Sequence, residues 1–542
     1  MYINFSDIPT HQNLFLDYIH EFENVERFYG KNFRAVDQYL PLFQKLSEKE
    51  RPNREMIHEI IKSQYNNPMS SKKTLQNIEL LNSKKTIVVA TGQQLGIFGG
   101  PLYTIYKSIT AIKLCNHLKE KFDEYNFVPI FWLEGDDHDY DEARNFSLLN
   151  NENQILNLKY DDGQLDEVNR GAIGFLKFNQ NIENVFTQLS AGLRETEFKA
   201  SLLELLRSIY QPEKTFLESF RELMIQLFDE FGLIVFNPTD SAVKRVLSPL
   251  FAKELTEFGD HTGLLVERSA ELEEVYHAQV KVKPINLFYI EEHERLSIEP
   301  TETGEYRLKG KRKKFTQEEL LKQLEFSPEK FSPNVLLRPI CQDFLFPTAF
   351  YVGGPGEISY FAQVSPLYKI YDIDEPFIYP RSSATIVEKG VKIILEKNNL
   401  EYVDIFTEED ELIKKIVSAS SEINLEMLFQ NTADEINGSL NQINQLLPLI
   451  DKTLGDLTVK SKLRIEETLN ALKAKAIEAE KRKYETTIRQ VSKVRNVLFP
   501  NSNLQERELS WIYFANKYGI DIVKWIFDEL AINKFEHQIL EM

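Results

Sequence analysis

Residues 131–142, FWLEGDDHDYDE, place six acids and one histidine directly after an apolar run. Asp136 and Asp139 are the candidate ligands for Mg²⁺, which prefers carboxylate oxygens. Asp137 and His138 are the candidates for proton transfer, since histidine titrates near neutral pH. Zinc is not expected, because a lone histidine without a cysteine partner lacks the usual ligand spacing. A solvated acidic loop is the remaining interpretation of this cluster.

A glycine-rich stretch, TGQQLGIFGGP at 91–101, is the second candidate site. Glycines let the backbone approach a ligand closely, and the start of the following helix offers free N–H groups to an anion. The stretch matches neither GxGxxG nor the P-loop pattern, so a tight turn with structural glycines is the alternative. The candidate substrate- or nucleotide-binding residues here are Gly92, Gln93, Gln94, Gly96, Gly99, Gly100, Tyr103 and Lys107.

A third cluster combines RPICQDFLFP at 338–347 with YVGGPGEISYF at 351–361 and YPRSS at 379–383. An arginine can bind a carboxylate or a phosphate through two parallel hydrogen bonds. Glu357 has the alternative role of capping a helix. The candidate binding residues of this cluster are Arg338, Asp343, Gly353, Gly354, Glu357 and Arg381.

Alternating strands and helices are expected to position these clusters. Short apolar runs predict strands at 86–90, 127–133 and 233–236, and helical spacing predicts a helix at 102–122. The stretch 334–363 predicts a strand, a loop, a second strand, a glycine loop and a helix. Because ligands bind at the carboxyl ends of strands in open α/β sheets, we expect a doubly wound parallel sheet with the site at that edge.

The chain divides into four expected parts. Residues 1–84 form a helical segment that packs on the core, and residues 85–390 form the core, with insertions at about 147–230 and 256–330. Residues 391–500 form a helical arm, and 501–542 return to the core. One long helix with a coiled-coil seam is expected in the arm, and a long surface helix is the alternative. The seam residues are Ile443, Leu447, Ile450, Leu454 and Leu457, then Ile465, Leu469, Leu472, Ala476 and Ala479.

The composition limits the classes of function. A net charge of -19 disfavours general nucleic-acid binding, and no apolar stretch is long enough to cross a membrane. Only two cysteines occur and no signal peptide is seen, so a cytoplasmic protein is expected. Cys115 and Cys341 are expected in the core, since neither has a histidine nearby in the sequence.

Four stretches, at 91–114, 128–146, 338–363 and 498–519, resemble the bacillithiol biosynthesis cysteine-adding enzyme family, a set of cysteine ligases. The resemblance implies a Rossmann-like core with connecting-peptide insertions and a coiled-coil arm that forms a homodimer. It also implies the last step of bacillithiol synthesis, in which the carboxyl group of L-cysteine is joined to the amine of glucosaminyl-malate.

That reaction needs an activated carboxylate, most simply through ATP, with ADP as a further possible ligand. The glycine loop, the acidic cluster and the two arginines would then serve as phosphate cradle, metal or base site, and malate anchors. Two alternatives stay open: a nucleotide-dependent ligase or transferase for another amino acid or sugar, and a coiled-coil scaffold with a degenerate α/β domain. The clustering of glycines, acids and arginines disfavours the scaffold.

Overall fold

The computed structural model describes residues 1–65, 70–420, 424–451 and 453–542. The chain separates into two compact units. The first unit holds residues 1–386 together with 503–540, and the second holds 387–502 together with 541–542. Within the described residues, every helix is too short or too polar to cross a bilayer.

A five-stranded parallel sheet forms the centre of the first unit. Its order is β13-β12-β2-β3-β6, so the chain adds two strands on one side of β2 and then returns to add two on the other. This is the order of a Rossmann-like doubly wound sheet, as predicted. The strands are β2 (Thr86–Gln94), β3 (Asn126–Glu134), β6 (Ile234–Phe236), β12 (Thr348–Gly353) and β13 (Phe377–Pro380).

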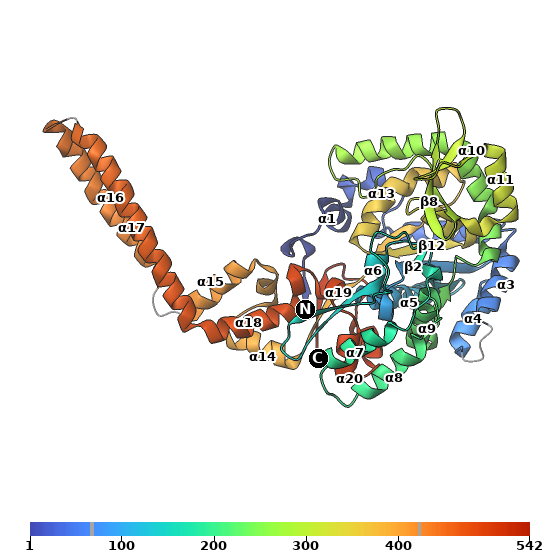
Figure 1. Ribbon diagram of the computed structural model, residues 1–542, viewed down its shortest axis with the longest axis horizontal. Helices are drawn as coiled ribbons and strands as arrows, with labels where there is room; N and C mark the ends of the chain where they lie inside the picture. Colours follow the sequence, from blue (N-terminus) through green and yellow to red (C-terminus); the bar gives the residue numbers. More distant parts are fainter. Residues whose placement is uncertain (66–69, 421–423, 452) are drawn as a thin grey trace. The chain divides into compact units, whose positions relative to one another are not determined.

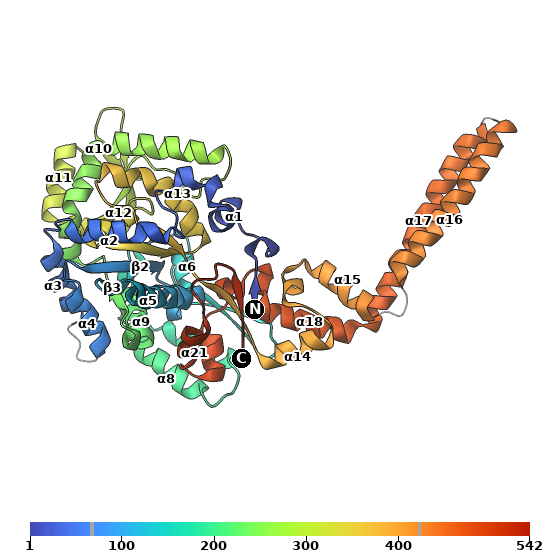
Figure 2. The same ribbon diagram turned by 180° about the vertical axis from the view of Figure 1, so that it is seen from behind.

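Helices cover both faces of this sheet. Helix α5 (Tyr103–Lys121) connects β2 to β3, and α13 (Pro355–Ile370) connects β12 to β13. The two helices lie on opposite faces, as Figures 1 and 2 show from two sides. Both faces of the strands are therefore buried, which explains the continuous apolar runs that predicted them.

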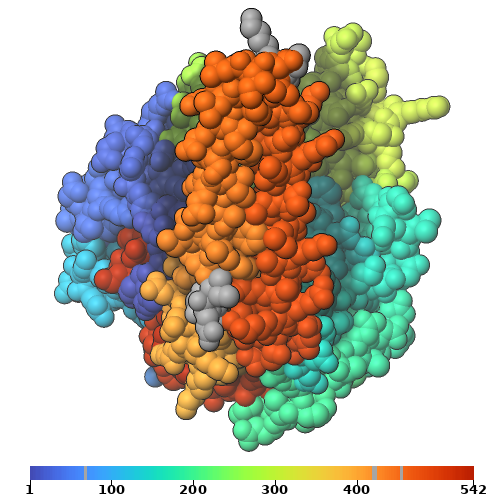
Figure 3. All heavy atoms as spheres, turned by 90° about the vertical axis from the view of Figure 1, so that its left-hand side faces the viewer, coloured from blue at the N-terminus to red at the C-terminus, as the bar shows by residue number. Residues whose placement is uncertain are grey.

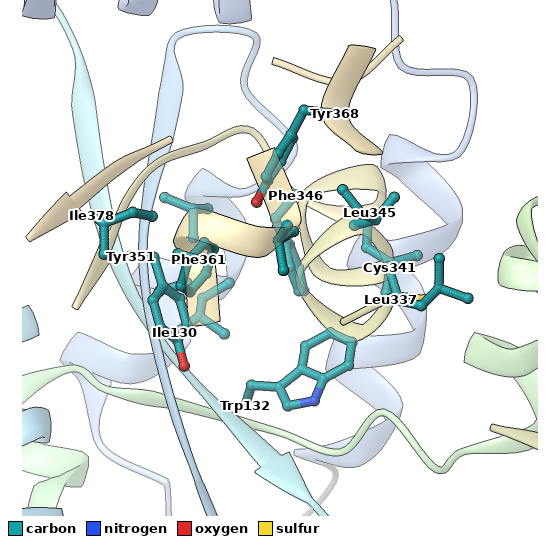
Figure 4. Close-up of a cluster of buried hydrophobic side chains, with 14 of the residues drawn as sticks. Ile130, Trp132, Leu337, Cys341, Leu345, Phe346, Tyr351, Phe361, Tyr368 and Ile378 are labelled. Atoms are coloured by element: carbon teal, nitrogen blue, oxygen red, sulfur yellow. The ribbon is translucent and has the colours of Figure 1, made fainter. Parts of the chain in front are cut away.

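The hydrophobic core beside α13 fixes the strand ends that carry the candidate site. Figure 4 shows Ile130 and Trp132 of β3 close to the side chains of the helices after residue 337. The indole of Trp132 is 2% exposed, so this layer excludes water. Further members of the same cluster are Leu337, Cys341, Leu345, Phe346, Tyr351, Phe361, Tyr368 and Ile378.

The strand predicted at the start of 334–363 is wrong, because helix α12 (Arg338–Leu345) follows there instead. The side chain of Asn334 accepts hydrogen bonds from the N–H groups of Leu336 and Leu337, both at 3.0 Å. These bonds turn the chain into the helix, and Pro339 is tolerated because it lies in the first turn. Arg338 therefore lies at the start of a helix, not at a strand end. The strands predicted at 86–90, 127–133 and 233–236 and the helix at 102–122 are confirmed.

Segments from both ends of the sequence complete the first unit. The N-terminal part is helical, as predicted, and strand β1 (Tyr2–Ile3) pairs with β15 (His537–Glu541), which neighbours β14 (Ser383–Val387). The N-terminal helices are α1 (Asn13–His20), α2 (Tyr39–Glu48), α3 (Arg54–Gln64) and α4 (Lys72–Leu80). The later helices are α19 (Gln505–Glu508), α20 (Ile512–Tyr518) and α21 (Ile522–Glu529).

Two stretches are inserted between the parallel strands. The first holds α6 (Tyr140–Arg144), the hairpin of β4 (Asn145–Leu149) and β5 (Ile155–Lys159), and helices α7 (Ile182–Gly192), α8 (Lys199–Ile209) and α9 (Phe216–Phe228). The second follows α10 (Ser241–Glu273) and is an antiparallel sheet of β7 (Leu287–Glu291), β8 (Glu294–Pro300), β9 (Tyr306–Leu308), β10 (Lys314–Phe315) and β11 (Phe331–Pro333), with α11 (Gln317–Phe326).

The second unit contains a helical hairpin rather than one long helix. Helix α16 (Leu425–Leu446) ends at a turn that contains Pro448, and α17 (Thr453–Lys483) packs against α16 (Figure 3). The expectation of a single helix through residues 443–457 is therefore wrong, because proline cannot donate the helical hydrogen bond. The remaining helices are α14 (Lys389–Lys397), α15 (Glu409–Ser420) and α18 (Glu485–Leu498). We call α16 and α17 the helical arm.

Candidate functional site

A cavity of about 940 Å³ lies at the carboxyl edge of the parallel sheet. Gly92 to Gln94 end β2, Glu134 ends β3, Gly354 follows β12 and Arg381 follows β13. The sheet order reverses between β2 and β12, where ligands bind in this fold. We call this space the sheet-edge cavity. The predicted residues that line it are Gly92, Gln93, Gln94, Tyr103, Lys107, Asp136, Asp137, His138, Asp139, Arg338, Gly354, Glu357 and Arg381.

Lys107 is buried on α5, yet its ammonium group is fully bound. It donates to the carbonyl of Gly92 at 2.9 Å and to Gln93 Oε1 at 2.8 Å, and it forms an ion pair with Glu357. Burial lowers the pKa of Lys107, and Glu357 opposes that effect. For Glu357, burial raises the pKa, but Lys107 and the N–H of Gly354 outweigh it and the net pKa is lowered. The pair therefore closes one wall of the cavity as an ion pair.

Arg338 is also held on every side. Its Nη1 donates to Gln342 at 3.1 Å, its Nη2 donates to Tyr360 at 2.9 Å, and its Nε lies 3.0 Å from Glu134 Oε1. Its guanidinium group stacks over the ring of Tyr351. Each nitrogen of the guanidinium group already has a partner in the protein, and the contact of Nε with Glu134 orients that carboxylate.

Glu134 is a carboxylate of the cavity whose pKa is strongly shifted by its surroundings. Burial raises the pKa of Glu134 to about 7, against the opposing effect of Arg338 and with a further rise from Asp137 and Asp136. Its side chain is still 23% exposed, so the cavity reaches it. A carboxylate with a pKa near neutrality can exchange a proton at physiological pH.

The carboxylates of the acidic loop after β3 are of two kinds: one is paired with a lysine, and the others have no lysine or arginine partner among the described residues. Asp136 is buried and forms an ion pair with Lys244 of α10. Asp139 accepts from the N–H of Glu142 at 3.0 Å and caps α6. Asp137 Oδ1 accepts from the N–H of His138 at 2.6 Å. Asp137 and Asp139 therefore face the cavity without a cationic partner of Lys or Arg type among the described residues.

These residues do not fit the predicted magnesium site. Asp136 Oδ1 is buried without a hydrogen bond, but the ammonium of Lys244 occupies the other oxygen and would repel a cation. The described part of the chain contains no cluster of three or more His, Cys, Asp or Glu side chains arranged to hold a metal ion.

His138 contacts Arg295 of the second insertion, 157 residues away in the sequence. Arg295 Nη1 lies 3.0 Å from His138 Nδ1, and an arginine can only donate, so Nδ1 accepts and Nε2 carries the proton. Burial lowers the pKa of His138, and the charge of Arg295 lowers it further. His138 is therefore a neutral side chain that offers an N–H group to the cavity.

Arg381 is anchored on one side and open on the other. Its Nη1 donates to Glu506 of α19 at 2.7 Å, and Glu506 also accepts from the N–H of Ala384 at 2.9 Å. No hydrogen bond joins Arg381 Nη2 to any other described residue. This side of the guanidinium lies close to Gly354, where an added Cβ would be 3.8 Å from Nη2. Arg381 thus presents a free donor beside the start of α13.

Five predicted site residues lie outside the cavity lining. Gly96 and Gly100 pack on each other, since a Cβ on Gly96 would lie 2.7 Å from the Cα of Gly100. Gly99 packs against Trp511, and the N–H of Leu102 donates to Leu509 at 2.8 Å, which covers the start of α5. Gly96, Gly99 and Gly100 therefore fit the alternative interpretation, a tight turn in which the glycines are needed for packing. Asp343 is buried, where it accepts from Tyr368 at 2.6 Å, and Gly353 ends β12 behind the lining.

Several lining residues were not singled out from the sequence. Glu134 was counted in the acidic cluster without a role, although its place at the end of β3 could have indicated one. Arg295, Lys281 and Lys283 come from the second insertion, and Arg507 comes from α19. No local pattern marks these four, because they reach the cavity from distant parts of the chain.

Comparisons with known proteins agree with this architecture. A family model described as "Bacillithiol biosynthesis BshC, N-terminal Rossmann-like domain" matches residues 1–382, and the matching "C-terminal coiled-coil domain" covers 384–542. The relative named "Putative cysteine ligase BshC" from Salinibacter ruber is 34% identical, over 97% of this chain and 96% of the relative. Those of Chloroherpeton thalassium and Flavobacterium psychrophilum are 32% and 28% identical, over 95% of this chain and 93% and 94% of the relatives.

The matches extend across both units, and they confirm the resemblance found in the sequence. They join a Rossmann-like domain to a coiled-coil domain in the order that the structure shows. The chain therefore belongs to the bacillithiol biosynthesis BshC family.

Proposed function

We propose that this protein is a cysteine ligase of bacillithiol biosynthesis, which joins the carboxyl carbon of L-cysteine to the amine of glucosaminyl-malate. The observation that carries the proposal is the sheet-edge cavity, which combines open carboxylates with open cations in a chain whose relatives are named as cysteine ligases. An amino acid and an amino sugar that bears malate present both charges, so they need both kinds of partner.

The free donor of Arg381 is the proposed anchor for a carboxylate of malate. Arg381 Nη2 lies beside Gly354, and the cavity is also lined by Pro355 and Gly356 at the start of α13. A helix start stabilises an anion through its free N–H groups and its dipole. An added Cβ on Gly356 would meet no atom within 4 Å, so this surface has room for a ligand.

Glu134 is the proposed base for the sugar amine. The carboxylate takes one proton from the ammonium group, and the neutral nitrogen attacks the activated carboxyl carbon of cysteine. The bond between that carbon and the activated oxygen then breaks with both electrons going to the oxygen, and the nitrogen releases a second proton to solvent as the amide forms. When bound, ATP supplies the phosphoryl or adenylyl group that makes this oxygen a leaving group. The N–H of His138 is placed to donate to an oxygen in the cavity. The roles in proton transfer assigned to Asp137 and His138 from the sequence stay predictions.

The proposal is tested with purified protein, L-cysteine, glucosaminyl-malate and ATP. We expect a product heavier than glucosaminyl-malate by one cysteine minus one water, measured by mass spectrometry. In cells, deletion of the gene should remove bacillithiol and accumulate glucosaminyl-malate. Unchanged thiols in the deletion strain, or no amide product in the purified reaction, would contradict the proposal.

The pH dependence tests the base. A carboxyl with a pKa of about 7 accepts a proton only when ionised, so kcat/KM should fall about tenfold per pH unit below that value and level off above it. Glu134→Gln should lower kcat/KM about 100-fold or more at pH 8. The fall in kcat/KM below pH 7 should also be absent from this variant. Glu152→Gln, at the exposed turn between β4 and β5, is the matched control and should keep the wild-type profile.

The helical arm is the proposed site of homodimer formation in the cytoplasm. Its paired helices leave large apolar side chains in water, with Leu446 and Leu472 63% and 58% exposed. Exposed apolar surface of this kind is typical of an interface. Light scattering after size exclusion should give twice the mass of 63.3 kDa, and Leu446→Glu with Leu472→Glu should give the monomer.

A further inference from the structure

We propose that Lys281 and Lys283 bind the phosphate chain of the nucleotide that activates cysteine. Both residues line the sheet-edge cavity from the segment between α10 and β7. This inference rests on the proposed function, and it names the part of the cavity that takes the nucleotide. The two lysines take the phosphate-binding role that the sequence predicts for the glycine loop after β2. Gly96, Gly99 and Gly100 of that loop lie outside the cavity lining.

The lysine-bearing segment is fixed in place by its neighbours. Gln363 of α13, which is fully buried, accepts from the N–H of Val280 at 2.8 Å and donates to its carbonyl at 2.9 Å. Val280 and Val282 pack against the hydrophobic core. The two lysines therefore alternate with residues that are anchored to α13 and to the hydrophobic core.

Neither lysine has a charged partner among the described residues. Across the residues that the structure covers, neither ammonium group forms an ion pair or a side-chain hydrogen bond; Arg507 in the lining is likewise without an ion pair, whereas other cations of the cavity are paired with carboxylates. Lys107 is paired with Glu357, Arg338 with Glu134 and Arg144 with Asp141. Two uncompensated cations in one cavity of a protein with net charge -19 indicate a ligand with several negative charges.

Phosphate suits these side chains better than a carboxylate does. An ammonium group is a compact charge that binds tetrahedral phosphate oxygens in many orientations, whereas the planar guanidinium binds two oxygens of one carboxylate or phosphate in a fixed geometry. The cavity holds both kinds of group, with Arg381 beside α13 and the lysines on the segment after α10. We therefore assign malate to the arginine and the phosphates to the lysines.

Titration calorimetry on the full-length protein tests this assignment, with ATP and glucosaminyl-malate as separate probes. Lys281→Ala with Lys283→Ala should weaken ATP binding by about 30-fold and leave glucosaminyl-malate within about twofold. The variant with arginine at both positions keeps the charges and should stay within about threefold of wild type for ATP. Lys309→Ala with Arg312→Ala removes two exposed charges from the same insertion outside the cavity and should change neither affinity.

The outcomes separate this inference from the ligase proposal. Unchanged ATP affinity in the double alanine variant overturns the lysine site, as does a loss confined to glucosaminyl-malate, which would assign the lysines to malate. Amide formation by the wild type without any nucleotide also overturns it but leaves the ligase in place. Lysine-dependent ATP binding without amide formation supports the site and contradicts the ligase.

Discussion

Two strand–glycine–helix junctions of the same sheet have similar sequences and different roles. The junction after β2, at 95–101, is covered by the segment around Trp511, and its glycines pack on protein atoms. The junction after β12, at 353–356, opens onto the cavity, and a Cβ added to Gly356 would meet no atom within 4 Å. Glycine content therefore does not distinguish a structural turn from a ligand-binding one. The segment that packs over the start of the following helix decides whether the turn can bind a ligand.

Removing the cover of the first junction should have the largest effect. The indole of Trp511 is 1% exposed, and its Nε1 donates to the carbonyl of Phe98 at 2.8 Å. Trp511→Ala should lower the free energy of unfolding by about 4 kcal/mol, since it leaves a large cavity in the core. Chemical denaturation measures this change. Trp511→Phe keeps most of the packing and should lose about 1–2 kcal/mol; equal losses in both variants would show that packing over the loop is unimportant.

Filling the first junction should have the next largest effect. A Cβ on Gly96 would lie 2.7 Å from the Cα of Gly100, so Gly96→Ala forces two backbone segments apart. We expect a loss of about 2 kcal/mol in stability. Thermal unfolding followed by circular dichroism measures it, and an unchanged melting temperature would mean that the contact is not tight in solution.

The donor beside the second junction should affect binding more than folding. Arg381→Lys keeps a cation near Glu506 but loses the planar fork that faces Gly354. The KM for glucosaminyl-malate should rise about tenfold or more, because a lysine cannot bind a carboxylate through two parallel bonds. Steady-state kinetics with each substrate varied in turn measures this. A rise in the KM for cysteine alone would show that Arg381 binds cysteine rather than malate.

Filling the second junction should have the smallest effect on stability. Gly356 lies in the first turn of α13 with open space around it, so Gly356→Ala should change the free energy of unfolding by less than about 1 kcal/mol, in the stabilising direction. Because Gly356 lines the cavity, the added methyl group should raise a substrate KM a few-fold. Chemical denaturation measures the free energy of unfolding, and kinetics on the same preparation measures the KM. A loss of stability as large as that of Gly96→Ala would show that the two glycine junctions do not differ in packing.

Local sequence patterns located the sheet and one loop of the site, but not the contacts that complete it. The run at 86–90 is β-branched and apolar because it is buried on both faces, and the acids at 136–139 follow a strand directly, so both could be placed from the sequence. The apolar residues at 335–337 predict a strand, because the cap formed by Asn334 has no distinctive spacing in the sequence. Pro448 marks the turn of the arm in the sequence, a signal that the spacing of the apolar residues alone does not carry.

Contacts between distant segments explain the rest of what was missed. His138 and Arg295 are 157 residues apart, and Arg381 and Glu506 are 125 residues apart. Nothing in the local sequence of either partner specifies such a pair. Whether an arginine is open to a ligand depends on these partners, which is why Arg338 and Arg381 looked equivalent in the sequence and differ in the structure.

The pairing of Arg381 with Glu506 also sets an order for assembly of the site during synthesis. A ribosome finishes the sheet-edge strands, with Arg381 just after β13, and then translates the whole stretch 387–502, a compact unit of its own, before Glu506 appears. Until then the guanidinium has no carboxylate to hold it, and the start of α5 has no cover from Leu509. The nascent chain therefore lacks one side of the site until residues 503–540 have been made, and a translational pause inside 387–502 would prolong that state.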